Sequence, residues 1–332
     1  MNTPHKNRIV KIIVWIVGVI ILIAALLVVA AFFWPATSKQ LQSSNSEKLN
    51  YNQSVAAAIR TINGDSSNTD VRPECRSIIK THSQKTAKAV LMVHGVSACP
   101  QQFAELGDTF FKAGYNVYIP RVPSHGLTDN KRHGEITIPA MAQFMNSSTS
   151  IISGLGEETG VIGLSGGANM ATWIAQYNSA TISRALLLSP FYQPSASEMP
   201  AWQSPLLRNL YGRDILPDSF SAGSNLSYRA LGKYMIIAKN YKSDFKAPGL
   251  KHIGVVTSEN DTSIDMNLAA NIPKQIATAS NAKFQSYSIP ASFGIGHDIV
   301  ALRQDEVKKH ANKLYQFYLN IYEGKDVKLE SN

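Results

Sequence analysis

The chain is poor in cysteine. Only two of its 332 residues are cysteines, Cys75 and Cys99, and there is neither a Cys-x-x-Cys pair nor a set of histidines at metal-ligand spacing. This pattern argues against a zinc site, so we expect no metal and no cofactor. Charged residues make up 17% and hydrophobic residues 44% of the chain, a balance that argues against disorder and against a polytopic membrane protein.

Acidic residues are missing from the first 46 positions, which carry four Lys or Arg. The formal net charge is +9, but the rest of the chain has 28 basic and 23 acidic residues, a mild excess. No basic cluster alternates with aromatic residues along one face, so we predict no nucleic-acid partner.

Residues 12–34 form 23 consecutive uncharged, mostly apolar residues. A helix of that length is about 34 Å long, enough to cross the hydrocarbon of a bilayer. Lys6, Arg8 and Lys11 precede it, which predicts a cytoplasmic segment 1–11, a signal anchor 12–34 and a catalytic domain outside the membrane. The alternative is a cleaved signal peptide, but its apolar stretch is normally shorter and ends in small residues, unlike Phe33-Trp34-Pro35.

Residues 35–54 are rich in Ser, Asn, Gln and Lys and read as a polar linker, followed by one globular domain, 55–332. There, short apolar runs alternate with amphipathic stretches, which predicts a mostly parallel sheet with helices on both faces. Between 190 and 251 the alternation stops, and we expect a helical lid insertion. The expected strands are 88–94, 116–121, 160–164, 184–189, 252–258 and 284–289, and the expected helices are 55–62, 101–112, 138–152, 168–177 and 299–322.

Gly163-Leu164-Ser165-Gly166-Gly167 matches the pattern G-x-S-x-G. It lies between a predicted strand and a predicted helix, where a tight turn exposes the serine oxygen. A glycine turn without chemistry is the alternative for such a pentapeptide. The flanking elements favour Ser165 as a nucleophile.

A serine hydroxyl needs a base and an orienting carboxylate, in the chain order Ser, acid, His on such a fold. His297 follows the last predicted strand and is the expected base, whereas His252 and His310 fall beside a strand and inside a helix. Asp261 follows the strand 252–258 and is the expected acid, with Asp265 and Glu259 as alternatives.

The oxyanion of a tetrahedral intermediate needs two backbone donors. The N–H of Gly166, at the start of a helix, is one candidate, and the N–H of Val96, in the loop after His94-Gly95, is the other. We expect His94 to brace this loop.

With these residues in view, the chain from about Cys75 to Tyr322 resembles the α/β-hydrolase superfamily, in particular its bacterial esterase, lipase and serine-aminopeptidase-like branch. The resemblance rests on Val93-His94-Gly95, Gly114–Arg121 with His125-Gly126 beyond it, the turn at Ser165 and the two later loops. It implies the α/β-hydrolase fold, a lid over residues 190–251 and a triad of Ser165, Asp261 and His297.

The two cysteines are a candidate disulfide if the domain is exported, although two unlinked thiols remain the alternative. A bond between Cys75 and Cys99 closes a loop of about 25 residues, worth about 3 kcal/mol. Because Cys99 lies in the loop of Val96, we hypothesise that it fixes the second oxyanion donor.

We therefore expect a membrane-anchored serine hydrolase that cleaves carboxylic esters. Its expected partners are a small-molecule ester, for which the location at a membrane favours a lipophilic one, and the bilayer. A peptidase or amidase is the alternative, favoured by a lid carboxylate such as Glu198, Asp214 or Asp218, and a silent binding module is the third. Large apolar residues of the insertion are expected to shape an acyl pocket, and some of them are expected only to pack the lid on the sheet. They are Trp202, Leu206, Leu207, Leu210, Tyr211, Phe220, Tyr228, Tyr234 and Phe245.

Overall fold

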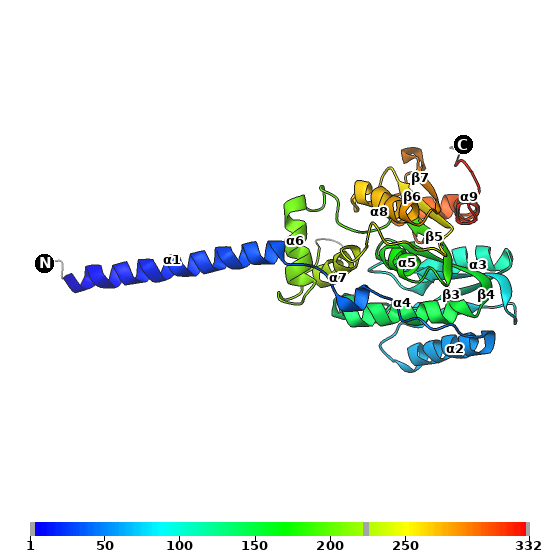
Figure 1. Cartoon of the computed structure of the whole chain (residues 1–332), viewed down its shortest axis with the longest axis horizontal. Coiled ribbons are helices and arrows are strands. Elements are labelled where there is room, and N and C mark those ends of the chain that lie inside the picture. The colour runs from blue at the N-terminus through cyan, green and yellow to red at the C-terminus, as the bar shows by residue number, and fades with distance from the viewer. Residues whose placement is uncertain (1–3, 222–225, 330–332) are drawn as a thin grey trace.

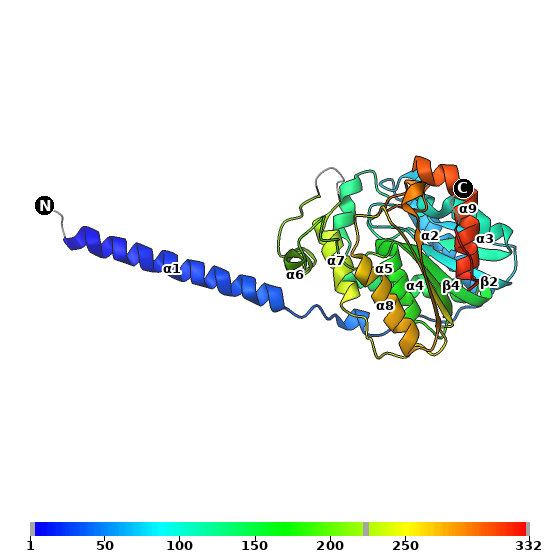
Figure 2. The same cartoon turned by 90° about the horizontal axis from the view of Figure 1, so that it is seen from above.

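The protein consists of one long N-terminal helix and one α/β domain, seen here in a computed structural model that describes residues 4–221 and 226–329. Helix α1, Pro4–Phe33, leaves the domain as a single rod (Figures 1 and 2). Its stretch Arg8–Phe33 is 26 residues long with a mean hydropathy of 3.4, and none of its most apolar part is buried. Such a helix fits either a membrane anchor or a signal sequence.

A seven-stranded sheet forms the centre of the domain, in the order β1-β3-β2-β4-β5-β6-β7. Every neighbouring pair is parallel except β1 with β3. This arrangement confirms the predicted α/β-hydrolase fold with its mostly parallel sheet. The strands are Ile78–Lys80 (β1), Thr86–Val93 (β2), Tyr115–Ile119 (β3), Gly156–Leu164 (β4), Ile182–Leu188 (β5), His252–Ser258 (β6) and Lys283–Ile289 (β7).

Helices cover both faces of the sheet, as the alternating pattern predicts (Figure 2). On one face, α4 (Ile138–Ser153), α5 (Gly166–Tyr177) and α8 (Met266–Ala279) enclose a core that includes Met145, Trp173 and Ile276. On the other face, α3 (Ala104–Lys112) and α9 (Asp305–Tyr322) enclose a second core that includes Phe110 and Tyr318. The sheet is therefore shielded from water on both sides, which its apolar strands require.

Residues 35–50 differ from the solvated linker that their composition suggests, because they lie along the domain. Leu41 is fully buried, and its carbonyl accepts a hydrogen bond from Trp173 Nε1 at 3.0 Å. Asn240 Nδ2 donates to the carbonyl of Ala36 at 3.0 Å. The polar side chains of this segment thus pair with polar groups of the domain. Helix α2, Tyr51–Ser67, follows at once and is capped by Asn50, so the folded part begins before residue 55.

The insertion between β5 and β6 forms a helical cover, as expected. It contains the short turns Ala201–Gln203 (η5) and Ser204–Leu206 (α6), the π-helical turn Leu207–Tyr211 (η6) and the helix Tyr228–Ala238 (α7). In Figures 1 and 2, α6 and α7 lie between α1 and the rest of the domain. Asn169 Nδ2 of α5 donates to the carbonyls of Phe191 and Tyr234, each at 2.8 Å, and so ties the insertion to the sheet.

Two elements have no counterpart in the sequence-based expectation. Strand β1 has only three residues, all half-buried, so it shows no apolar run. Helix α8 contains Pro273 and polar residues that conceal its apolar face. The last helix, expected from residue 299, begins at Asp305, because residues 299–304 form a loop that buries Ile299 and Val300.

Candidate active site

Ser165 lies in the turn between β4 and α5 with a left-handed backbone, φ 56° and ψ −120°. A non-glycine residue rarely adopts positive φ, and such strain is typical of functional sites. The turn is held because Ser165 N–H donates to the carbonyl of Leu188 at 2.9 Å. A Cβ on Gly167 would lie 2.0 Å from the carbonyl oxygen of Val93, so only glycine permits this close approach of helix and strand.

Three of the predicted site residues form one hydrogen-bonded chain. His297 Nε2 lies 2.8 Å from Ser165 Oγ, and His297 Nδ1 lies 2.8 Å from Asp261 Oδ2. The carboxylate accepts the Nδ1 proton, which leaves Nε2 as the acceptor for the serine hydroxyl. The side chain of Asp261 is fully buried and its other oxygen accepts from Ser263 N–H at 2.9 Å, so the acid cannot swing away from the imidazole.

The two alternative acids are engaged elsewhere. Asp265 caps α8 by accepting from the N–H groups of Asn267 and Leu268, each at 3.0 Å. Glu259 accepts from Ala291 N–H at 2.8 Å. Of the three candidates, Asp261 is the carboxylate that contacts His297.

The two candidate oxyanion donors lie side by side. A Cβ built on Gly166 would be 2.4 Å from Cγ2 of Val96, so the loop after β2 touches the start of α5. Within the described residues, neither N–H has a hydrogen-bond acceptor. Val96 and Ser165 also line the same cavity, so Val96 and Gly166 remain the predicted donors to an oxyanion.

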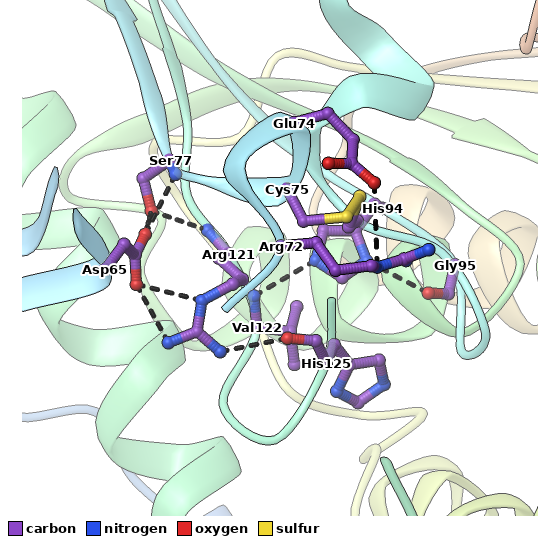
Figure 3. Close-up of a disulfide and its surroundings, with 11 residues drawn as sticks. Asp65, Arg72, Glu74, Cys75, Ser77, His94, Gly95, Arg121, Val122 and His125 are labelled. Atoms are coloured by element: carbon purple, nitrogen blue, oxygen red, sulfur yellow. Dashed lines mark hydrogen bonds and ion pairs between the residues drawn. A yellow bond between two sulfur atoms is a disulfide. The ribbon is translucent and has the colours of Figure 1, made fainter. Parts of the chain in front are cut away.

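His94 braces this loop (Figure 3). Its Nε2 accepts the N–H of Val122 at 3.0 Å, so the proton is on Nδ1, which donates to the carbonyl of Gly95 at 3.0 Å. Burial lowers the pKa of His94 to about 4, against the raising effect of the Gly95 hydrogen bond. The neutral imidazole therefore joins the loop after β2 to the loop after β3.

The disulfide between Cys75 and Cys99, present in the structure, fastens the other end of the same loop (Figure 3). Gly126 makes room for it: a Cβ there would lie 2.6 Å from Cβ of Cys75. Nearby, Arg121 pairs with Asp65 at 2.8 Å and donates to the carbonyl of His125 at 2.9 Å. Three segments distant in the sequence are thus held together beside the oxyanion loop.

Gln102 is a site residue that the sequence reasoning missed. Its Oε1 accepts Gly95 N–H at 2.8 Å, and its Nε2 donates to Asp298 Oδ2 at 3.0 Å. It thereby links the oxyanion loop to the residue next to His297. No motif signals this role, because a glutamine in a helical turn is common.

A cavity of about 530 Å³ opens above Ser165 and His297. Its apolar lining differs from the expected set: of the nine large residues predicted to shape it, only Tyr228 lines it. Trp202 is 61% exposed instead, and Tyr234 packs beneath the turn at Gly166. Apolar periodicity does not say which face of a short turn points inward. The apolar lining comes from Val96, Phe191, Pro194, Met199, Leu226, Tyr228 and Leu231.

Of the three candidate carboxylates in the lid, two are paired with other side chains and one lines the cavity. Asp214 accepts from Lys233 at 2.6 Å, and Asp218 accepts from the hydroxyl of Ser227 at 2.6 Å. Glu198 alone of the three lines the cavity. Within the described residues, no cluster of three or more His, Cys, Asp or Glu could hold a metal ion.

Comparison with known proteins agrees with this geometry. Residues 84–229 match the family described as serine aminopeptidase, S33. No curated protein matches the sequence. Solved structures resemble the fold at low identity, and all three below cover 73–75% of this chain.

A monoacylglycerol lipase of Paleococcus ferrophilus is 16% identical, with a TM-score of 0.54 over 98% of its own chain. Est1E of Butyrivibrio proteoclasticus, solved with ferulic acid, is 13% identical, with a TM-score of 0.52 over 96% of its chain. A monoglyceride lipase of Saccharomyces cerevisiae is 15% identical, with a TM-score of 0.51 over 90% of its chain. The family match covers less than half of the chain, and the solved structures show that the chain has the α/β-hydrolase fold.

Proposed function

We propose that the chain is a membrane-anchored serine hydrolase that cleaves carboxylic esters through an acyl-enzyme on Ser165. The observation that carries the proposal is the hydrogen-bonded chain from Ser165 through His297 to Asp261, 2.8 Å at each step, at the floor of a largely apolar cavity. The hydrolase superfamily supports the reaction class, and the fold's lipase and esterase neighbours support an ester as substrate.

The first half-reaction transfers the acyl group to the serine. His297 Nε2 takes the hydroxyl proton as Ser165 Oγ attacks the ester carbonyl, and Asp261 stabilises the resulting imidazolium. The N–H groups of Val96 and Gly166 donate to the oxyanion of the tetrahedral intermediate. Its collapse breaks the bond to the alcohol oxygen, which takes the proton from His297 and leaves.

The second half-reaction regenerates the enzyme. Water loses a proton to His297 Nε2 and attacks the acyl-enzyme carbonyl, and the same two N–H groups receive the new oxyanion. When this intermediate collapses, Ser165 Oγ recovers the proton and the carboxylic acid leaves. The residues at the site suffice for both steps.

The experiment is labelling of the full chain in detergent with a fluorophosphonate, with hydrolysis of p-nitrophenyl butyrate and laurate followed in parallel. We expect labelling of the wild type, none of Ser165→Ala, and undiminished labelling of Ser263→Ala, which removes another hydroxyl that lines the same cavity. Absence of labelling in folded wild type would reject the hydrolase and favour a binding module on this fold.

The anchor belongs to the same proposal. Residues 12–34 would cross the bilayer with residues 1–11 in the cytoplasm and the domain outside, where a disulfide such as Cys75–Cys99 is stable. Resistance of the chain to extraction with alkaline carbonate, and cleavage of the domain by protease added outside sealed cells, are the expected results. A soluble chain that starts after residue 35 would show a cleaved signal peptide instead.

A peptidase is the second candidate, and the position of Glu198 favours it. Its carboxylate lines the cavity above Ser165, where it could pair with the ammonium group of a peptide N-terminus. If peptides are the substrates, Glu198→Gln should abolish hydrolysis of aminoacyl p-nitroanilides and leave hydrolysis of p-nitrophenyl butyrate within about twofold.

A further inference from the structure

The end of α1 is fastened to the lid rather than to the sheet. Asn209, in the π-helical turn η6, is fully buried and donates through Nδ2 to the carbonyls of Ala31 at 2.7 Å and Trp34 at 3.1 Å. These carbonyls belong to the last turn of α1 and the residues after it, where a helix has no intrahelical donors left. The Arg213 guanidinium lies 4.7 Å from the centre of the Trp34 ring.

Cations without counter-charges gather at this junction. Arg208 donates to Asn209 at 3.3 Å, and Arg213 donates to the carbonyl of Pro35, but among the described residues neither they nor Lys239 forms an ion pair. Asp214, the residue after Arg213, pairs with Lys233 at 2.6 Å. A buried guanidinium nitrogen, Arg213 Nε, has no acceptor.

The three cations also act on one another. Burial and then the charge of Arg213 lower the pKa of Arg208, and burial and then the charge of Arg208 lower the pKa of Lys239. Mutual repulsion without an anion destabilises the folded chain, so an anion bound among them would be stabilising. A hollow of about 460 Å³ beside Arg213 is also lined by Lys39, of the segment after α1, and by the ion pair of Asp214 and Lys233.

The surroundings indicate the source of the anion. Outside α1 and Trp34, the exposed large apolar residues of the described chain are few, and two of them, Trp202 and Ile215, precede and follow η6 in the sequence. In Figure 1, α6 lies across the end of α1, so a bilayer around α1 would meet the lid at this surface. Aromatic residues beside cations are typical of the membrane interface.

We propose that Arg208, Arg213 and Lys239 bind the phosphate of an anionic phospholipid headgroup and so hold the lid against the bilayer. This inference rests on the membrane anchoring proposed above and is independent of the reaction. The headgroup would accept from the guanidinium groups and offset the repulsion among the three cations, while Trp202 and Ile215 contact the acyl boundary.

The test is native mass spectrometry of the full chain in detergent, titrated with phosphatidylglycerol or with phosphatidylcholine of the same acyl chains. Lys6, Arg8 and Lys11 would attract the same lipid, so every protein compared carries Gln at these three positions. We expect phosphatidylglycerol to bind at least about tenfold more tightly than phosphatidylcholine, because each juxtamembrane cation contributes about fivefold.

The variant R208Q/R213Q/K239Q should lose this preference. The control K112Q/K274Q/K308Q removes the same charge from exposed positions on α3, α8 and α9 and should keep it. Equal preference in the two variants would overturn the proposal. If the triple variant fails to fold, the single change Lys239→Gln, at the most exposed of the three positions, should weaken binding about fivefold, and an unchanged affinity would overturn the proposal equally.

Two further measurements distinguish a lipid headgroup from soluble phosphate, and the cation cluster from the active site. Inorganic phosphate at 50 mM should leave the lipid preference within about twofold; its abolition would assign the cluster to soluble phosphate and reject the lipid. Fluorophosphonate labelling of all variants should stay at the level of the wild type. No lipid preference in the parent protein, together with intact labelling, rejects this inference alone, whereas absent labelling of the parent protein with an intact preference rejects the hydrolase alone.

Discussion

The carboxyl edge of the sheet and the insertion 190–251 above it differ in what fixes their side chains. At the edge, Ser165, Asp261 and His297 follow β4, β6 and β7, and the registers of parallel strands bring the three loops together. The described part of the insertion, without residues 222–225, contains no strand and is held by single side chains such as Asn169 and Asn209. A sheet imposes positions on its loops, whereas a helical cover depends on particular contacts.

The largest effect should come from the edge of the sheet. Asp261→Asn keeps the shape but no longer holds the His297 tautomer that accepts the serine proton, so we expect kcat for p-nitrophenyl butyrate to fall about 10³- to 10⁴-fold. KM should change little, because the acid does not contact the substrate. Steady-state kinetics measure both constants.

The matched control is Asp265→Asn, which alters the neighbouring carboxylate that caps α8. Asparagine also caps helices well, so stability should fall by less than about 1 kcal/mol and kcat should stay within about twofold. Similar losses in both variants would show that the loop, and not the contact between Asp261 and His297, matters.

The contrast between the edge of the sheet and the insertion also explains which features can be predicted from the sequence. The strand His252–Ser258 and the turn at Ser165 are predictable because an apolar run and a G-x-S-x-G pattern carry local information. The prediction that Trp202 and Tyr234 line the pocket is wrong, because the hydrophobicity of a side chain does not say where in the fold it lies. Gln102 acts through partners that lie distant in the sequence, which no local pattern encodes.

The disulfide offers the second test, since it joins the oxyanion loop to a segment outside the sheet. Cys75→Ala/Cys99→Ala should lower the free energy of unfolding by about 3 kcal/mol, because the open chain gains loop entropy when it unfolds. Urea unfolding of a chain that starts at residue 35, and so keeps the packed segment 35–50, measures the change. An unchanged urea midpoint would mean that His94 and Arg121 hold the loop without the disulfide.

The third test uses pH and the buried His94. Its pKa is about 4 in the folded chain and near 6.5 when unfolded, so acidification puts a proton on the unfolded state first. The contribution of neutral His94 to the free energy of unfolding is complete above pH 6.5 and is lost as the pH falls toward 4. The loss between pH 7 and pH 5 is about 2 kcal/mol. In His94→Gln the free energy of unfolding should fall by about 2 kcal/mol less between pH 7 and pH 5 than in the wild type. An unchanged dependence of the unfolding free energy on pH would assign this loss to other histidines.

The smallest effect should come from substitutions in the insertion. These substitutions test which side chains of the insertion contact the substrate. Met199 is half-buried and lines the cavity, so Met199→Ala should lower kcat/KM for the laurate ester about fivefold more than for the butyrate ester, because only a long acyl chain reaches the vacated space. Trp202→Ala removes a larger side chain that is 61% exposed, and in detergent it should leave the ratio of the two esters unchanged. The reverse result would mean that the insertion turns Trp202 inward when substrate binds, and that the cover moves while the edge of the sheet stays fixed.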